Sequence, residues 1–356
     1  MNDMKEKIDM PKSSITSYEQ FTKRRISLAK WGMSYATLSA MAMVVLSLFN
    51  SGAQDTILAY LTQDVFTIMV LSWIAVGFME FFGGVVILIT KLMRGTPLAE
   101  YGRCLRIKKS TIFGLGIGFF GGPMATACMV IGVSMAGITY SNALIALAPM
   151  FASVAARIIY KDRPSTRAWL GVVIAIIGAI IASFSPPEGV ENFYLGIFFS
   201  ILAPIFFTIE GMIDAKVMDV YDPLVTCSLY RCILGGTWGF VISFVCCLVT
   251  GKMDTWLYIW YLIFSSPWIL FCLIVAIIAV AFQYGTFFLS VNYSGPGKAM
   301  VLVWTTPIWS IPIGFMLSPI FEYNVTFMGI IGAIIVVVGM VLIVMKPSEL
   351  VKVRNL

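Results

Sequence analysis

The chain has 356 residues, of which 59% are hydrophobic and only 12% are charged, and its formal net charge is +6. A globular chain carries about 25% charged residues, so this composition excludes an ordinary water-soluble fold and predicts an all-α integral membrane protein. The apolar runs do not alternate with polar residues at every second position, which excludes the strands of a membrane barrel.

The first thirty residues form a polar segment that we expect to be cytoplasmic. It has no apolar stretch followed by a small-residue cleavage site, so no signal peptide is predicted. Between Ile15 and Lys30, apolar residues stand beside Lys23, Arg24 and Arg25. This pattern fits a basic flank of the first span, and it also fits an amphipathic helix lying at the membrane surface.

Ten apolar segments follow, most of them near the roughly 20 residues that an α-helix needs to cross a bilayer core of about 30 Å. They are Trp31–Phe49, Phe66–Leu92, Thr111–Ser134, Tyr140–Tyr160, Trp169–Phe184, Phe193–Met212, Leu224–Val249, Trp268–Ser290, Ala299–Leu317 and Phe327–Val344. The sequence therefore predicts ten transmembrane helices.

The Lys and Arg residues of the connecting segments indicate the orientation, because cytoplasmic loops carry an excess of both. With the N- and C-termini in the cytoplasm, Lys252 is the one basic loop residue that falls outside. The outer loops then carry the acidic residues Asp55, Asp64, Glu188, Glu191, Asp254 and Glu322. We expect a multi-pass protein of the plasma (inner) membrane whose positive charge faces anionic lipids and binds no nucleic acid.

Proline and glycine recur at one spacing in the two halves of the chain. Pro149 and Gly171 are matched by Pro307 and Gly329 at an offset of 158 residues. This predicts a five-helix repeat at 31–184, an external linker at 185–192, a second repeat at 193–345 and a cytoplasmic tail at 346–356. Because each repeat has an odd number of spans, the second is inverted relative to the first, as in many transporters.

Two segments at corresponding places in the halves carry a further pattern. The first copy is Tyr140-Ser141-Asn142-Ala143, Pro149, Lys161-Asp162-Arg163-Pro164-Ser165 and Trp169-Leu170-Gly171, and the second is Gly295-Pro296-Gly297-Lys298-Ala299, Pro307, Gly329 and Gly332. This pattern resembles the EamA type of the drug/metabolite transporter superfamily, from Trp31 to Met345. The resemblance implies a five-plus-five inverted repeat of ten spans and transport of a solute that it does not identify. It also implies a central cavity among the third, fourth, eighth and ninth spans, which would include Asn142, Gln283, Tyr284 and Trp304.

Charged residues within the predicted spans are few, and three of them stand out. Each costs about 2.5 to 3.5 kcal/mol on insertion scales and so needs a partner or a water-filled cavity. Glu210 and Arg231 flank one cytoplasmic turn at similar distances, so they are expected at the same depth in adjacent antiparallel helices. Their ion pair is either structural or part of gating, since a moving bundle can break and reform it.

Glu80, the third charge, has no evident partner in the sequence. It lies near the middle of the second span and shares a helical face with Trp73 and Gly77. A carboxylate beside an indole is suited to binding an amine-bearing or other cationic solute, or to exchanging a proton. The alternative is a neutral carboxyl that is hydrogen-bonded to a neighbouring helix.

The polar and aromatic residues Asn142, Gln283, Tyr284 and Trp304 are candidates for substrate binding, against the alternative that each makes an interhelical hydrogen bond or packing contact. Pro149 and Pro307 are candidates for bending their helices, because each removes a backbone donor and leaves a carbonyl unpaired one turn earlier.

Several classes of chemistry are not expected. The chain has no histidine, and its seven cysteines show no metal-ligand spacing, so neither a metal site nor a cofactor is predicted. No phosphate-binding glycine loop is followed by lysine, and no catalytic constellation is visible. We therefore expect no enzyme and no direct coupling to ATP.

The sequence favours a secondary transporter that moves a small organic metabolite by alternating access, with a mild preference for amine-bearing or aromatic solutes. Its expected partners are this solute, membrane lipids and protons as a candidate coupling ion, in a monomer or a homodimer. The alternatives are a membrane-embedded lipid-handling enzyme, which needs acids or bases clustered at one interface, and a channel or sensor, which needs a continuous polar stripe.

Overall fold

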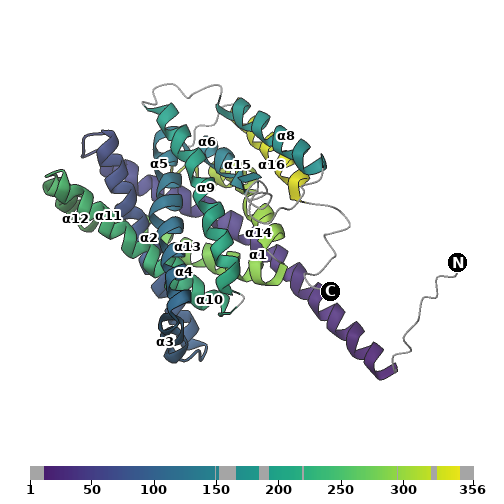
Figure 1. Ribbon diagram of the computed structural model, residues 1–356. Helices are drawn as coiled ribbons and strands as arrows, with labels where there is room; N and C mark the ends of the chain where they lie inside the picture. The colour runs from purple at the N-terminus through teal and green to yellow at the C-terminus, as the bar shows by residue number, and fades with distance from the viewer. Residues whose placement is uncertain are drawn as a thin grey trace.

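Helices make up all the regular secondary structure in residues 12–148, 150–151, 166–183, 192–218, 220–294, 296–321 and 327–344, which the computed structural model describes (Figure 1). They are α1 (Lys12–Leu58), α2 (Val65–Met93), α3 (Leu98–Arg106), α4 (Lys108–Phe119), η1 (Phe120–Thr126), α5 (Ala127–Ala136), α6 (Ile138–Ile145), α8 (Thr166–Ser183), α9 (Phe193–Met218), α10 (Pro223–Thr226), η2 (Cys227–Leu234), α11 (Gly235–Val249), α12 (Met253–Ser265), α13 (Pro267–Ser294), α14 (Pro296–Val303), α15 (Thr306–Leu317) and α16 (Phe327–Val344). The η elements are π-helical turns within longer helices.

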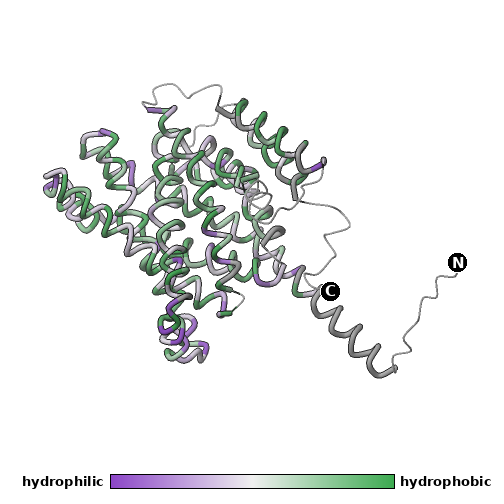
Figure 2. The backbone as a smooth tube through the Cα atoms, viewed as in Figure 1, coloured by the Kyte–Doolittle hydropathy of each residue, from purple (hydrophilic) through white to green (hydrophobic). Residues whose placement is uncertain are grey.

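Within these residues, six helical stretches are long and apolar enough to cross a membrane. They are Lys30–Leu58, Val65–Met93, Thr111–Ala136, Phe193–Asp214, Pro223–Val249 and Pro267–Ser294. They coincide with six of the predicted segments, and shorter apolar stretches at Thr306–Leu317 and Phe327–Gly339 fall in the ninth and tenth. Helices α6 and α8 fall in the fourth and fifth, and residues 149 and 152–160 of the fourth lie outside the described residues. The protein is thus a multi-pass α-helical membrane protein, with hydrophobic residues along its long helices (Figure 2).

The first helix is longer than predicted at both ends. It begins at Lys12, so no turn separates the basic N-terminal flank from the first span, and it continues beyond Phe49 to Leu58. Two of the polar residues after Phe49, Asn50 and Gln54, are buried, and Gln54 is bonded to α5. Ser134 Oγ donates to Gln54 Oε1 at 2.9 Å, and Gln54 is buried. A hydrogen bond from a distant helix thus stabilises a segment whose polar composition predicted a loop.

Helix α12 lies where the charge pattern predicted only an outer loop. Its thirteen residues are too few to cross a bilayer. Trp256 Nε1 donates to Ser243 Oγ of α11 at 3.3 Å, and the Trp256 and Trp260 rings lie 5.6 Å apart between centroids. Tryptophan and tyrosine are enriched at membrane–water interfaces, so this aromatic helix fits a position at the membrane surface.

Four long contacts between helices organise the bundle. Helix α1 packs along α13, α9 along α5 and η1, α2 along α11 and η2, and α8 along α16. In Figure 1 the pair α8 and α16 lies at one edge of the molecule, and α11 and α12 lie at the opposite edge. Between these edges stand the helices that carry the buried charges described below.

Helices α2 and α11 approach each other closely because glycines face each other at their contact. A Cβ atom at Gly236 would lie 2.8 Å from the Gly77 carbonyl oxygen, and one at Gly239 would lie 2.8 Å from the Trp73 carbonyl oxygen. Small residues at helix interfaces let backbones come into direct contact within a membrane. Backbone contact thus holds α2 and α11 together at mid-length.

Ion pairs join both ends of α2 to the segments that flank the continuous stretch of α10, η2 and α11. Asp64 at the start of α2 lies 3.5 Å from Lys252, and Lys91 near the end of α2 lies 3.0 Å from Asp222. Asp222 also caps α10 by accepting hydrogen bonds from the backbone amides of two following residues at 2.9 and 3.1 Å. Burial acts to raise the pKa of Asp64, but hydrogen bonds from Thr67 and the charge of Lys252 outweigh it and lower that pKa below its ordinary value.

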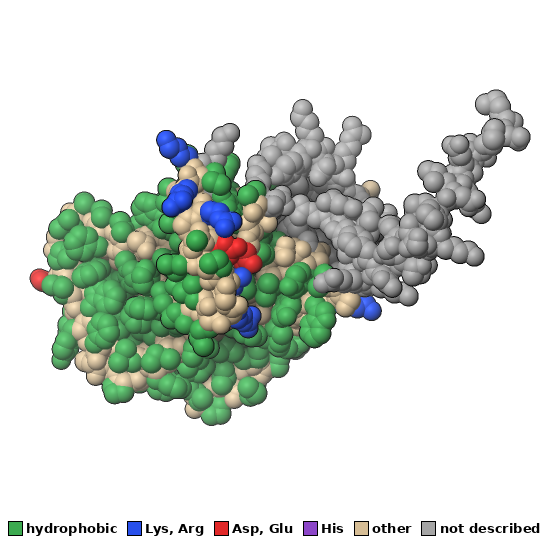
Figure 3. Space-filling view, turned by 90° about the horizontal axis from the view of Figure 1, so that it is seen from below, with side chains coloured by type: hydrophobic (Ala, Val, Ile, Leu, Met, Phe, Trp, Pro, Cys, Tyr) green, Lys and Arg blue, Asp and Glu red, His purple; other side chains and the backbone are tan. Residues whose placement is uncertain are grey.

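Basic side chains gather at the end of the molecule where α3 lies, and Figure 3 shows them on a face that is otherwise largely hydrophobic. The exposed members of this group are Arg94, Arg103, Arg106 and Lys108. Helix α3 is fixed to η2 by Tyr101 Oη, which lies 3.2 Å from Ser228 Oγ, and by Tyr230 Oη, which donates to the Cys104 carbonyl at 2.8 Å.

Candidate functional site

A fully buried arginine occupies the centre of the described bundle. Arg231, on η2, has no exposed surface, and its Nη1 lies 2.9 Å from Oε2 of Glu80 on α2. Its Nε forms a second ion pair with Oε1 of Glu210 on α9. One guanidinium thus connects three spans and faces two carboxylates.

The remaining nitrogen of Arg231 is also fully engaged. Nη2 donates to Thr126 Oγ1 at 2.7 Å, to the Gly121 carbonyl at 3.2 Å and to the hydroxyl of Tyr284. The guanidinium carbon lies 4.2 Å from the centroid of the Tyr284 ring, which gives a cation–π contact. The Tyr284 hydroxyl in turn donates to Glu80 Oε1 at 3.5 Å. We call Glu80, Thr126, Glu210, Arg231 and Tyr284 the ion cluster.

The π-helical turn η1 makes room for this cluster. A Cβ atom at Gly121 would lie 2.5 Å from Glu210 Oε1 and 2.6 Å from Arg231 Nε, so only glycine fits there. Pro123 has no backbone N–H, and its ring interrupts the regular hydrogen-bond ladder. The Gly121 carbonyl accepts from Thr126 Oγ1 at 2.8 Å and from Arg231 Nη2. Single π-helical turns are frequent at functional sites.

Two residues expected to bind solute belong to this buried framework instead. Glu80 is not unpaired, because the guanidinium of Arg231 lies against it. The sequence could not reveal this pair, since its members are far apart in the chain and neighbouring in space. Trp73 Nε1 donates to the Pro123 carbonyl at 3.2 Å. Neither Trp73 nor Glu80 lines the cavity described next.

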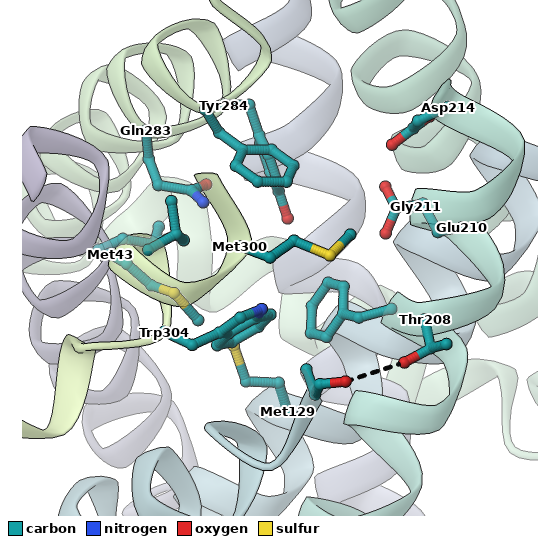
Figure 4. Close-up of a pocket in the computed structure, with 15 residues that line it drawn as sticks. Met43, Met129, Thr208, Glu210, Gly211, Asp214, Gln283, Tyr284, Met300 and Trp304 are labelled. Atoms are coloured by element: carbon teal, nitrogen blue, oxygen red, sulfur yellow. Dashed lines mark hydrogen bonds between the residues drawn. The ribbon is translucent and has the colours of Figure 1, made fainter. Parts of the chain in front are cut away.

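A cavity lies beside the ion cluster, between helices from both halves of the chain (Figure 4). It contains about 590 Å³ of empty space, including the space at its opening. Its walls are Met43 and Leu46 of α1, Met129 of α5, Phe207, Thr208, Glu210, Gly211 and Asp214 of α9, Gln283, Tyr284 and Phe287 of α13, Met300 and Val303 of α14, and, outside these helices, Ala148 and Trp304. Aromatic rings and methionines make up much of this surface.

Three of the predicted binding residues lie in the cavity wall. Gln283, Tyr284 and Trp304 all face it, and the Trp304 and Phe207 rings lie 5.2 Å apart between centroids. Asn142 does not line the cavity. It is buried on α6, and neither atom of its amide group has a hydrogen-bond partner.

The ninth predicted span is divided rather than bent. Helix α14 ends at Val303 and α15 begins at Thr306, with Pro307 in its first turn. Proline is well accommodated there, because the first backbone donors of a helix have no acceptor within it. The break brings Trp304 to the cavity wall. Pro149, its expected counterpart, lies outside the described residues.

Asp214 is the charged residue of the cavity that the sequence analysis missed. The predicted sixth span ended at Met212, whereas α9 continues to Met218 and carries Asp214 one turn after Glu210. The side chain is 3% exposed, and neither carboxylate oxygen has a hydrogen-bond partner. The spacing of four between two acidic residues at the end of an apolar segment was the signal that could have identified it.

The described side chains of the site carry more acidic than basic groups. Glu80, Glu210 and Asp214 are opposed by the single guanidinium of Arg231. Burying an ion costs several kcal/mol even after the protein relaxes around it, so an excess of buried carboxyls requires protons or a bound cation. Within the described residues, no group of three or more Asp, Glu or Cys residues has an arrangement that could hold a metal ion.

Three comparisons with known proteins bear on this arrangement. Residues 30–184 match the EamA-like transporter family. Protein LicB of Haemophilus influenzae is 25% identical over 201 residues, which cover 56% of this chain and 65% of LicB, slightly less than two thirds of that protein. A crystal structure of another protein matches with a TM-score of 0.51 at 13% identity, covering 89% of this chain and 97% of the other. This last likeness concerns the fold alone.

Proposed function

We propose that this chain, whose residues 30–184 match the EamA-like transporter family, is a secondary transporter that carries a small organic metabolite by alternating access. The family match supports a membrane transporter and leaves the solute open. The observation that carries the proposal is the cavity, which lies between helices of both halves and beside breakable buried ion pairs. Secondary transporters bind their solutes near mid-membrane, at the interface of their repeats.

The helix contacts support an inverted repeat of residues 31–184 and 193–345, joined by the linker 185–192. If spans one to five correspond to spans six to ten, exchanging the halves turns the contact of α1 with α13 into that of α9 with α5 and η1. The same exchange leaves the contacts of α2 with α11 and of α8 with α16 in place. A bundle without internal symmetry has no reason to pair its helices in this way.

Individual residues support the same relation. Asp64 and Asp222 are 158 positions apart, the offset of the repeated prolines, and each directly precedes its helix and pairs with a lysine. Thr126 and Tyr284 share this offset, and their hydroxyl oxygens lie 3.2 Å apart. Equivalent residues that touch each other are expected where a twofold axis passes between two repeats.

In the proposed topology, ten spans cross a plasma membrane and both termini lie on its cytoplasmic side. The exposed basic residues around α3 support this orientation, because positively charged loops are retained on the cytoplasmic side. In the proposed cycle, the two halves rock about the cavity and open it to each side in turn. The ion pair of Glu210 with Arg231 lies between the cavity and the contact of α2 with η2. This ion pair can rearrange as the halves move.

The walls of the cavity favour a carrier over the alternatives. Methionine and aromatic side chains make up much of the described cavity wall, whereas a channel would need a continuous polar path. The paired charges Glu80, Glu210 and Arg231 lie beside the cavity, within helices long enough to cross a membrane, whereas a lipid-handling enzyme needs acids or bases clustered at one interface. Aromatic rings suit a solute with an apolar or aromatic part, and the carboxyls suit one with an amine. Protons are a candidate coupling ion.

Reconstitution tests the proposal. The purified full-length protein is screened by thermal unfolding against amines, amino acids and nucleosides, because a ligand of the native state raises the unfolding temperature. The flux of each stabilising compound into proteoliposomes is then measured. We expect saturable flux that Gly211→Phe abolishes by filling the cavity, whereas Gly102→Phe, which enters open space, leaves it intact. Flux that rises linearly with concentration, or that survives Gly211→Phe, would contradict the carrier.

A further inference from the structure

Asp214 remains unexplained after the ion cluster has been assigned. Arg231 binds Glu80 and Glu210, and its remaining nitrogen donates to neutral oxygens. Asp214 lies in the cavity wall with both carboxylate oxygens buried and without a hydrogen-bond partner. A carboxylate held in this way in a membrane bundle marks a functional site by default.

A second buried group points to the same ligand chemistry. Oε1 of Gln283, on α13, also has no hydrogen-bond partner, and Gln283 is 5% exposed. Figure 4 shows Gln283 on the wall of the cavity that faces α9, the helix of Asp214. Among the described cavity-lining residues, the buried side-chain atoms that lack a partner are these three oxygens, and each is an acceptor. A ligand that satisfies them must donate hydrogen bonds or carry positive charge.

The rest of the wall fits the apolar part of such a ligand. The Phe207 and Trp304 rings pack against each other in the wall, and Met43, Met129 and Met300 add polarizable side chains. Aromatic faces attract cations, and this attraction is stronger where water is excluded. An anion would instead meet a wall that already holds more carboxyl groups than guanidinium groups.

On the basis of the proposed transport function, we infer that the solute is an organic cation whose positive group is bound by Asp214. The ion cluster then has a separate role, because Arg231 neutralises Glu80 and Glu210 and leaves Asp214 as the carboxyl available to the solute. Gln283 is a second acceptor for an ammonium N–H. This assignment moves the expected cation-binding role from Glu80 to a residue just beyond the end of the predicted sixth span.

Three probes of one shape and different charge test the inference. Benzylamine is a cation at neutral pH, benzyl alcohol is neutral and benzoate is an anion. Their binding to the detergent-purified full chain is measured by thermal unfolding and by isothermal titration. We expect benzylamine to bind at least about tenfold more tightly than benzyl alcohol, because a charge-assisted hydrogen bond lowers a dissociation constant by about tenfold or more. Benzoate should not bind.

The variant Asp214→Asn removes the charge and keeps the shape. It is expected to weaken benzylamine binding to the level of benzyl alcohol, with benzyl alcohol itself unaffected, and Asp214→Glu is expected to restore part of the preference. Asp64→Asn, which removes a carboxylate outside the cavity, is the matched control and should change none of the three affinities. If Asp214→Asn fails to fold, the charge preference of the unmodified protein and the Asp214→Glu variant still decide the question.

Two sets of results would overturn the inference. Benzyl alcohol binding as tightly as benzylamine, or benzylamine binding equally well to Asp214→Asn, would mean that Asp214 is a neutral, protonated group without contact to the solute. Failure of every cationic probe, together with saturable flux of a neutral or anionic metabolite, would refute the inference and leave the transporter intact. Saturable flux of no compound would instead count against the proposed function itself.

Discussion

Replacing Arg231 by methionine is expected to destabilise the protein more than any other single substitution in the ion cluster. The change keeps much of the side-chain length but removes the group that faces Glu80 and Glu210 and donates to Thr126 and Tyr284. Removing one partner of a buried ion pair costs about 3 to 5 kcal/mol, because the other partner is left as an uncompensated buried charge. Here two carboxylates lose their partner at once.

The loss of stability in Arg231→Met depends on whether the two unpaired carboxylates can reach water. Neither Glu80 nor Glu210 can reach water, since their side chains in the pairs with Arg231 are 0% and 6% exposed. Both must take up protons or disrupt the packing of α2 and α9. We therefore expect Arg231→Met to lose at least the upper part of that range, about 5 kcal/mol. The triple variant Arg231→Met, Glu80→Gln, Glu210→Gln should recover most of it, because no unpaired charge remains.

Stability is measured as unfolding of the purified protein in mixed micelles of rising denaturing-detergent content, followed by tryptophan fluorescence. Arg231→Lys serves as the conservative comparison and should fall in between, since an ammonium keeps the charge but cannot reproduce the fork of donors. If Arg231→Met unfolds at the same point as the unmodified protein, or if the triple variant is less stable than Arg231→Met, the reasoning from unpaired charge is wrong.

Three further outcomes are expected from residues outside the cavity. Gly236→Val should destabilise the protein by about 1 to 3 kcal/mol in the same assay, because the valine side chain would meet the α2 backbone. Gly102→Val, where the added atoms enter open space, should have little effect. Equal losses of stability from the two variants would argue against close packing of α2 and α11. Asp222→Ala should cost about 1 kcal/mol through loss of the helix cap, and Asp222→Asn should cost less, since the amide still caps α10 but no longer pairs with Lys91. Equal losses would mean that the ion pair, which both variants remove, matters more than the cap. The pKa of Asp64 is lowered on folding, so its stabilising contribution is present above the ordinary pKa of 3.8 and lost as the pH falls through the folded value. When the unfolding temperature is measured below pH 5, it should fall less with decreasing pH for Asp64→Asn than for the unmodified protein. An equal fall in both proteins would contradict this assignment.

Much of the bundle could be predicted from the sequence because the bilayer imposes a simple rule. A helix that crosses it must be apolar over roughly 20 residues, so hydropathy alone identifies the long spans. Depth could be predicted as well: Glu210 and Arg231 flank one turn at similar distances, and in the structure they lie in contact. What escaped prediction depends on packing between distant segments. Gln54 continues α1 because Ser134 meets it, and Glu80 is neutralised by a residue of the other half.

The site was predictable only in part for the same reason. Residues that line a cavity by virtue of their span, such as Gln283 and Trp304, could be proposed from a family resemblance. Asp214 was missed because the predicted span ended two residues before it, although its spacing of four from Glu210 was a local signal that α9 continues as a helix. The π-helical turn at Gly121 was also unforeseen, since its wide geometry depends on hydrogen bonds from Arg231 and Thr126.

The ion pairs between α2 and the η2–α11 helix lie near both ends and in the middle of their contact. Because this contact is held by ion pairs at three positions along its length, it resists both sliding and separation of the helices. The cavity lies on the other side of the central pair. If the two halves rock as proposed, the contact of these helices is the natural hinge line of the motion. Helices far from a hinge line move much further than those beside it, so small rotations there would suffice to open the distant cavity mouths while the core charges stay sheltered from lipid.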